Sequence, residues 1–132
     1  MAMSGQLKRI LCVEDEPDVQ PVLRLALQRV GQFEVLICGS GEEALVDGPA
    51  FAPDLLVFDV VMPGLDGPAT LAKARSIPEL ANVPAVFVTG KTKPEDIAHY
   101  HTMGVIGVIP KPFDIKGLSA ELQRIWDSAA SS

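Results

Sequence analysis

Residues 55–64, with the sequence LLVFDVVMPG, carry the strongest strand signal in the chain and hold an ionisable residue inside it. Apolar, strand-forming residues lead directly into Asp59, two valines follow, and Pro63 and Gly64 end the run. A buried carboxylate that has no partner costs several kcal/mol. We therefore expect Asp59 to lie at the end of a buried strand, beside a group that compensates its charge.

Length and composition limit the alternatives. The 132 residues predict one domain, residues 1–132, and the 48% apolar and 21% charged content is ordinary for a globular protein. A net charge of −6 argues against direct nucleic-acid binding, because no basic stripe is present to neutralise phosphates. No apolar run is long enough to span a bilayer, and the first residues lack a secretory signal pattern. We therefore expect a cytoplasmic protein that does not contact membranes, with Cys12 and Cys38 reduced and buried.

Apolar runs alternate with amphipathic segments along the whole chain. The apolar runs are continuous, which is typical of strands covered on both faces. Strict alternation of strand and helix predicts an α/β fold with a parallel sheet. The expected strands are residues 9–13, 33–38, 54–59, 84–89 and 105–110, and the expected helices are residues 18–30, 41–48, 67–76, 94–103 and 114–128.

Polar residues follow four of the expected strands at the point where each strand ends. In such sheets ligands bind at the carboxyl ends of the strands, so we expect these side chains to share one edge. Taken singly, an acid after a strand is typical of a helix cap, a threonine there is typical of a hydroxyl that closes the strand, and a lysine is typical of a solvated loop charge. Together they indicate a site for Mg²⁺ and phosphate, with an aspartate as nucleophile toward phosphorus. They are Glu14, Asp15, Asp59, Thr89 and Lys111, and Gly90 beside Thr89 leaves access open.

The motifs around these residues closely resemble the receiver domain of two-component response regulators. They are ILCVEDEP (10–17), LLVFDVVMPGLDG (55–67), VPAVFVTG (83–90) and PKPF (110–113), and the resemblance covers about residues 7–127. It implies a flavodoxin-like sheet of five parallel strands in the order 2-1-3-4-5, with two helices on one face and three on the other. It also implies a signalling domain and not an enzyme, although one that phosphorylates and dephosphorylates itself with Mg²⁺.

The resemblance assigns a role to each site residue. Asp59 would accept a phosphoryl group from a histidine kinase or a histidine phosphotransfer protein. Mg²⁺ would be held by Glu14, Asp15, Asp59 and the backbone carbonyl of Val61. Thr89, Gly90 and Lys111 would contact the phosphoryl group, and the bond before Pro112 would be cis. The output partner is not implied.

The fifth strand departs from the family pattern. Receivers commonly carry Tyr or Phe on the fifth strand, three residues before the lysine, and this chain has Val108 there. The usual aromatic relay is therefore missing, which keeps open a pseudo-receiver that binds partners without phosphorylation. An aspartyl-nucleophile phosphohydrolase is disfavoured, because Val61 stands where such enzymes carry a second acid. A receiver that belongs to a hybrid kinase or a multidomain regulator also stays open.

Overall fold

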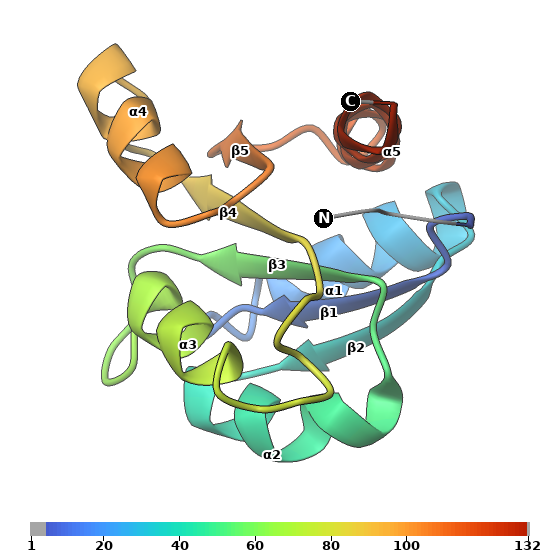
Figure 1. Ribbon diagram of the computed structural model, residues 1–132. Helices are drawn as coiled ribbons and strands as arrows, with labels where there is room; N and C mark the ends of the chain where they lie inside the picture. The colour runs from blue at the N-terminus through green and yellow to red at the C-terminus, as the bar shows by residue number, and fades with distance from the viewer. Residues whose placement is uncertain (1–4, 132) are drawn as a thin grey trace.

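Five parallel strands form one sheet in the order β2-β1-β3-β4-β5, as predicted. The computed structural model describes residues 5–131 (Figure 1). The strands are β1 (Arg9–Val13), β2 (Glu34–Cys38), β3 (Leu55–Asp59), β4 (Ala85–Thr89) and β5 (Gly107–Pro110). The helices are α1 (Gln20–Arg24), η1 (Leu25–Val30), α2 (Gly41–Phe51), α3 (Gly67–Ala74), α4 (Pro94–Thr102) and α5 (Leu118–Ala130).

The central strands are apolar on both faces because helices cover both faces. Every residue of β3 and β4 is buried, and Asp59 pairs with Val88 at the end of the β3–β4 ladder. Side chains alternate across the sheet and so feed two separate cores. One core lies under α1, η1 and α5, and the other lies under α2, α3 and α4. Figure 1 shows α2 and α3 on the side of the sheet opposite to α5.

The first predicted helix, residues 18–30, differs from the observed one. The observed helix begins at Gln20, and its second half is the π-helix η1. The Gly31 amide, directly after η1, donates a hydrogen bond to the Ala26 carbonyl (3.2 Å). The Ser119 hydroxyl of α5 donates to the same carbonyl. A wider helical turn exposes a carbonyl to such a partner, which explains a change that residues 18–30 alone do not encode.

The last predicted helix, residues 114–128, is also displaced. Residues 115–117 form a turn in which the Gly117 and Leu118 amides donate to the Asp114 carbonyl (3.2 and 2.9 Å), and α5 then runs from Leu118 to Ala130. Ile115 therefore lies outside the helix but still packs against the core. Trp126 is buried, as the helical spacing predicts.

Helix caps hold the loops around the sheet edge. The sequence Ser40-Gly41-Glu42-Glu43 has the spacing of a capping box, and the Ser40 hydroxyl accepts from the Glu43 amide (3.1 Å). The Glu43 carboxylate reaches back to the Gly39 amide (3.0 Å) and not to Ser40. At α3 the Asp66 carboxylate accepts from the Ala69 amide (2.8 Å). Both caps satisfy amides of a first turn that have no partner within the helix.

Candidate functional site

Three carboxylates meet at the carboxyl ends of β1 and β3. Glu14 and Asp15 follow β1, Asp59 ends β3, and one oxygen from each lies within 4.8 Å of the others. Glu14 and Asp59 are buried, and Asp15 is half-buried. The cluster forms because the parallel register aligns the two strand ends, as the sequence predicted.

Lys111, which follows β5, supplies a positive charge to this cluster. Its Nζ lies 2.5 Å from Asp59 Oδ2 and 3.3 Å from Glu14 Oε1. Burial raises the pKa of Glu14, although the Glu16 amide and Lys111 oppose the shift. Burial alone would lower the pKa of Lys111, but the hydrogen bond to Asp59 and the charges of Asp59 and Glu14 raise it overall. Lys111 therefore stays charged between the two acids.

The loop that carries the two first-strand acids is anchored from α1. The Gln20 side-chain amide donates to the Glu14 carbonyl (2.8 Å), and Glu14 Oε2 accepts from the Glu16 amide (3.1 Å). The sequence analysis did not single out Gln20, because a glutamine in a helix carries no chemical signal by itself. Its role comes from its position over the loop.

Thr89 and Gly90 lie at the end of β4. The buried Thr89 hydroxyl accepts from the Lys91 amide (3.0 Å), so its own hydrogen is free to donate elsewhere. Among residues 5–131, apart from its two chain neighbours, nothing lies within 4 Å of the position that a Cβ would take on Gly90. The approach to Thr89 is therefore open on that side.

Val61 lies two residues after Asp59, and Pro112 directly follows Lys111. The Val61 amide donates to Asp59 Oδ1 (3.3 Å), and its side chain is 65% exposed. The role of its carbonyl as a metal ligand stays a prediction. The Lys111–Pro112 peptide bond is cis, which confirms the expectation.

The arrangement fits a hard divalent cation. Three carboxylates at this distance repel one another, and the single ammonium of Lys111 offsets one charge. Mg²⁺ prefers oxygen donors and binds through one or two carboxylates while it keeps several waters. The donors present, two strand-end acids and Asp59, match that preference.

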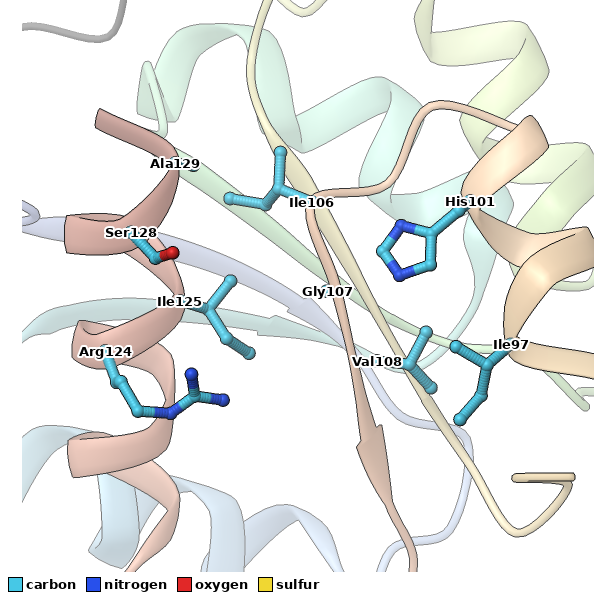
Figure 2. A pocket seen from close by; sticks show the side chains of 9 residues that line it. All are labelled: Ile97, His101, Ile106, Gly107, Val108, Arg124, Ile125, Ser128 and Ala129. Atoms are coloured by element: carbon cyan, nitrogen blue, oxygen red, sulfur yellow. The ribbon is translucent and has the colours of Figure 1, made fainter. Parts of the chain in front are cut away.

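Val108 lines a groove on the edge of the sheet. Figure 2 shows this groove, of about 510 Å³, between α4 and α5, with β5 as its floor. Val108 is half-buried, and Ile97 and His101 of α4 face Ile125 and Arg124 of α5 across it. The aromatic ring that the family usually carries at this position is absent, as the sequence indicated.

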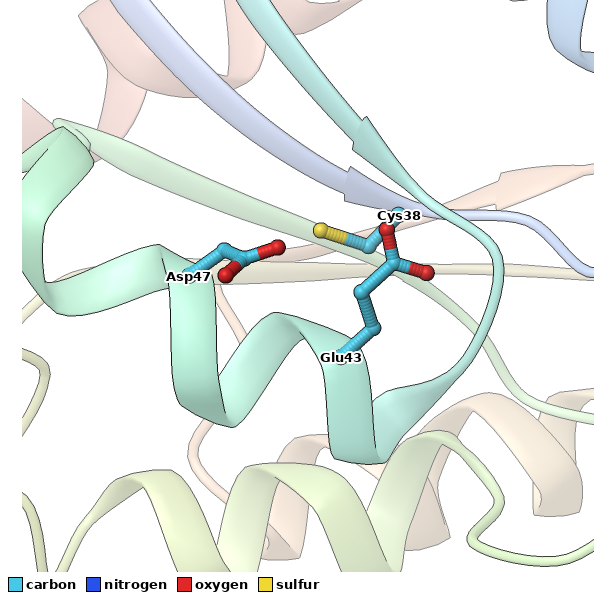
Figure 3. A group of neighbouring side chains, drawn as sticks. All are labelled: Cys38, Glu43 and Asp47. Atoms are coloured by element: carbon cyan, nitrogen blue, oxygen red, sulfur yellow. The ribbon is translucent and has the colours of Figure 1, made fainter.

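A second group of possible metal ligands, away from the site, joins the last residue of β2 to two acids of α2. Figure 3 shows the Cys38 thiol directed toward Asp47, with the Glu43 carboxylate also close to Cys38; both acids are exposed. Burial, then the charges of Glu43 and Asp47, raise the pKa of Cys38 to about 12. A metal ligand must be a thiolate, and this environment disfavours one. We therefore interpret Cys38 as a core thiol and Glu43 as a capping residue.

Comparison with known proteins identifies the family. Residues 10–123 match the family model of the response regulator receiver domain. The chain belongs to this family. The receiver is 31% identical over 121 residues to the DNA-binding response regulator MtrA of Mycolicibacterium smegmatis, covering 92% of this chain and 51% of that protein. The chain thus spans about half the length of this relative.

Solved structures show the same fold. The chemotaxis protein CheY4 of Vibrio cholerae superposes with a TM-score of 0.81 at 28% identity, over 90% of this chain and 98% of that one. A receiver domain of a signal transduction histidine kinase from Syntrophus aciditrophicus gives 0.76 at 27% identity, over 95% and 94%. This chain is therefore a receiver domain of two-component signalling, a system in which histidine kinases phosphorylate receivers. Among residues 5–131, no helix has both the length and the apolar character to cross a membrane.

Proposed function

We propose that this receiver accepts a phosphoryl group on Asp59 from a phosphohistidine, carried by a histidine kinase or a phosphotransfer protein. The observation that carries the proposal is the contact of Lys111 Nζ with Asp59 Oδ2 (2.5 Å) inside a cluster of three acids. A buried aspartate paired with an ammonium at an open sheet edge suits attack on phosphorus. Cytoplasmic residence is part of the proposal, and so is an output through protein contacts.

Asp59 acts as the nucleophile, and Lys111 and Thr89 stabilise the transferred phosphoryl group. A carboxylate oxygen of Asp59 attacks phosphorus, the P–N bond of the donor breaks, and the departing imidazole nitrogen keeps the electron pair and gains a proton from solvent. Lys111 and the Thr89 hydroxyl stabilise charge on the phosphoryl oxygens. Gly90 itself presents no side chain to an approaching donor, and the space that its Cβ would occupy is open.

Mg²⁺ is part of the same proposal. Glu14, Asp15, Asp59 and the Val61 carbonyl would hold the ion, which would neutralise charge on the phosphoryl group. The protein's own contribution is to keep its acids together before the ion binds. Lys111 and the anchored Glu14 loop do this.

The pseudo-receiver alternative has less support. Glu14, Asp15, Asp59, Thr89 and Lys111 are all present and follow or end strands at one edge of the sheet. The departure that keeps this alternative open is Val108 at the relay position. The hydrolase alternative lacks its general acid, because Val61 occupies that position.

Labelling with acetyl phosphate tests the proposal. We expect an acid-stable, alkali-labile acyl phosphate on the wild type with Mg²⁺, and none in Asp59→Asn or after chelation of the metal. Asp47→Asn, which removes an exposed acid on α2, is the matched control and should label normally. Equal labelling of Asp59→Asn and wild type would refute the site, and failure of both acetyl phosphate and phosphohistidine donors would favour the pseudo-receiver.

A further inference from the structure

The start of α3 touches the backbone of the proposed phosphoacceptor. Gly67 is buried, and a Cβ at this position would lie 2.4 Å from the Asp59 carbonyl oxygen. It would also lie 3.1 Å from the Asp59 carbonyl carbon and from the Val60 Cα. Separations under 3 Å from backbone atoms require the backbone itself to move. Only a residue without a side chain fits here.

The same contact closes the loop that follows β3. The Gly67 amide donates to the Val60 carbonyl (3.2 Å), so residues 61–66 leave the strand and return to it. On the strand side, the Val60 amide donates to the Val88 carbonyl (3.0 Å). The backbone next to Asp59 is thus held between β4 and the first residue of α3.

We propose that Gly67 is a positioning residue for phosphorylation: its missing side chain lets α3 clamp the backbone of residues 59–61 in the reactive position. The clamp would align two groups at once, the Asp59 carboxylate and the Val61 carbonyl. Glu14 and Asp15 come from the β1 loop and do not depend on it. This inference rests on the function proposed for Asp59.

Gly31 is also close-packed, but it lacks this consequence. A Cβ on Gly31 would lie 2.3 Å from the Ser119 hydroxyl of α5 and 2.8 Å from the ring of Phe33, which directly precedes β2. Both are side-chain atoms. Side chains can rotate away, and the site lies at the opposite ends of the strands. Gly31→Ala is therefore a matched control for crowding and for loss of stability.

The experiment compares Gly67→Ala, Gly31→Ala and wild type. Acyl phosphate formation is measured per folded molecule while the concentrations of acetyl phosphate and Mg²⁺ are varied. Because misplacement of a reacting group by about 1 Å can cost up to about a hundredfold in rate, we expect Gly67→Ala to lose at least about tenfold in maximal rate. Its half-saturating Mg²⁺ concentration should also rise. Gly31→Ala should match wild type in both, and equal values for the two variants would overturn the proposal.

Two further measurements cover the other outcomes. If Gly67→Ala does not fold, the exposed cap Asp66 replaces it: Asp66→Ala loosens the start of α3 and should slow labelling, whereas Asp66→Asn keeps the cap acceptor and should not. Equal rates would overturn the proposal. If wild type takes no phosphoryl group, the proposed function fails, and amide NMR shifts decide the positioning. Unmoved resonances of residues 59–61 in Gly67→Ala, or in Asp66→Ala where only that variant folds, would overturn it.

Discussion

Replacing Lys111 by alanine tests the electrostatic account of the site directly. The substitution leaves Glu14, whose side chain is 2% exposed, and Asp59, 8% exposed, without the cation that both contact. Loss of one partner from a fully buried ion pair costs about 3–5 kcal/mol. The Lys111 side chain is 27% exposed, so water screens part of the interaction and we expect a smaller loss. Our expectation is a decrease of about 2 kcal/mol in the free energy of unfolding without metal.

Mg²⁺ should change this difference in a defined direction. In the proposed site Mg²⁺ would compete with Lys111 for the same carboxylates in wild type, whereas in the variant it would compensate their charge in place of Lys111. The same Mg²⁺ concentration should therefore stabilise Lys111→Ala more than wild type, because the stabilisation that a ligand gives the folded state rises with the logarithm of its concentration divided by its dissociation constant.

Urea unfolding with and without Mg²⁺ measures both effects. The control is Arg124→Ala, which breaks an exposed pair with Glu121 and should change neither stability nor the response to Mg²⁺. A loss in Lys111→Ala no larger than in this control would refute the account. So would the same gain from Mg²⁺ in variant and wild type.

Two further predictions concern residues outside the cluster. Ser40→Ala should lower the free energy of unfolding by about 1 kcal/mol, since the Glu43 amide loses its cap, and Ser40→Asp should not; equal denaturation midpoints would contradict the assigned cap. Above pH 9, stability should fall as pH rises toward 12, because the unfolded Cys38 thiol ionises near 9.0 while the folded one has a pKa of about 12. Cys38→Ala should show a shallower decline in denaturant unfolding between these pH values, and an unchanged decline would assign the effect to other groups.

The strand framework was predictable because strand burial is written in the local sequence. The runs that end in Asp59 and Thr89 match β3 and β4 to within one residue, and the parallel arrangement then brings their ends together. The same reasoning placed Lys111, after the fifth strand, at the same edge of the sheet as Asp59, and the two side chains are in contact there. Chemistry at one sheet edge could therefore be derived before any coordinates.

Features that depend on tertiary contacts could not be predicted. The π-helical turn near Ala26 is stabilised by Ser119, which lies 93 residues away along the chain. Gly67 reads as an ordinary residue at a helix start, and its contact with Asp59 depends on how residues 61–66 fold back. The start of α5 was misplaced because Ile115 has helical spacing but lies in a turn. The π-helical turn and the role of Gly67 depend on contacts with residues that lie outside the stretch of sequence used to predict each element.

The two separate cores have a consequence for how this domain can diverge. Thr89 and Phe87 share one face of β4 by alternation, and the Phe87 ring packs edge-on against Tyr100 of α4, with centroids 5.7 Å apart. A movement of Thr89 would therefore disturb the packing of the layer formed by α2, α3 and α4. Val86 and Val88 point to the other face and pack in the α1–α5 layer. The sheet therefore separates the layer that contacts the Thr89 face of β4 from the α1–α5 layer on its other face. We expect substitutions in the α1–α5 layer to change mainly the stability of the domain, and substitutions around Phe87 and Tyr100 to change also how it responds at Thr89.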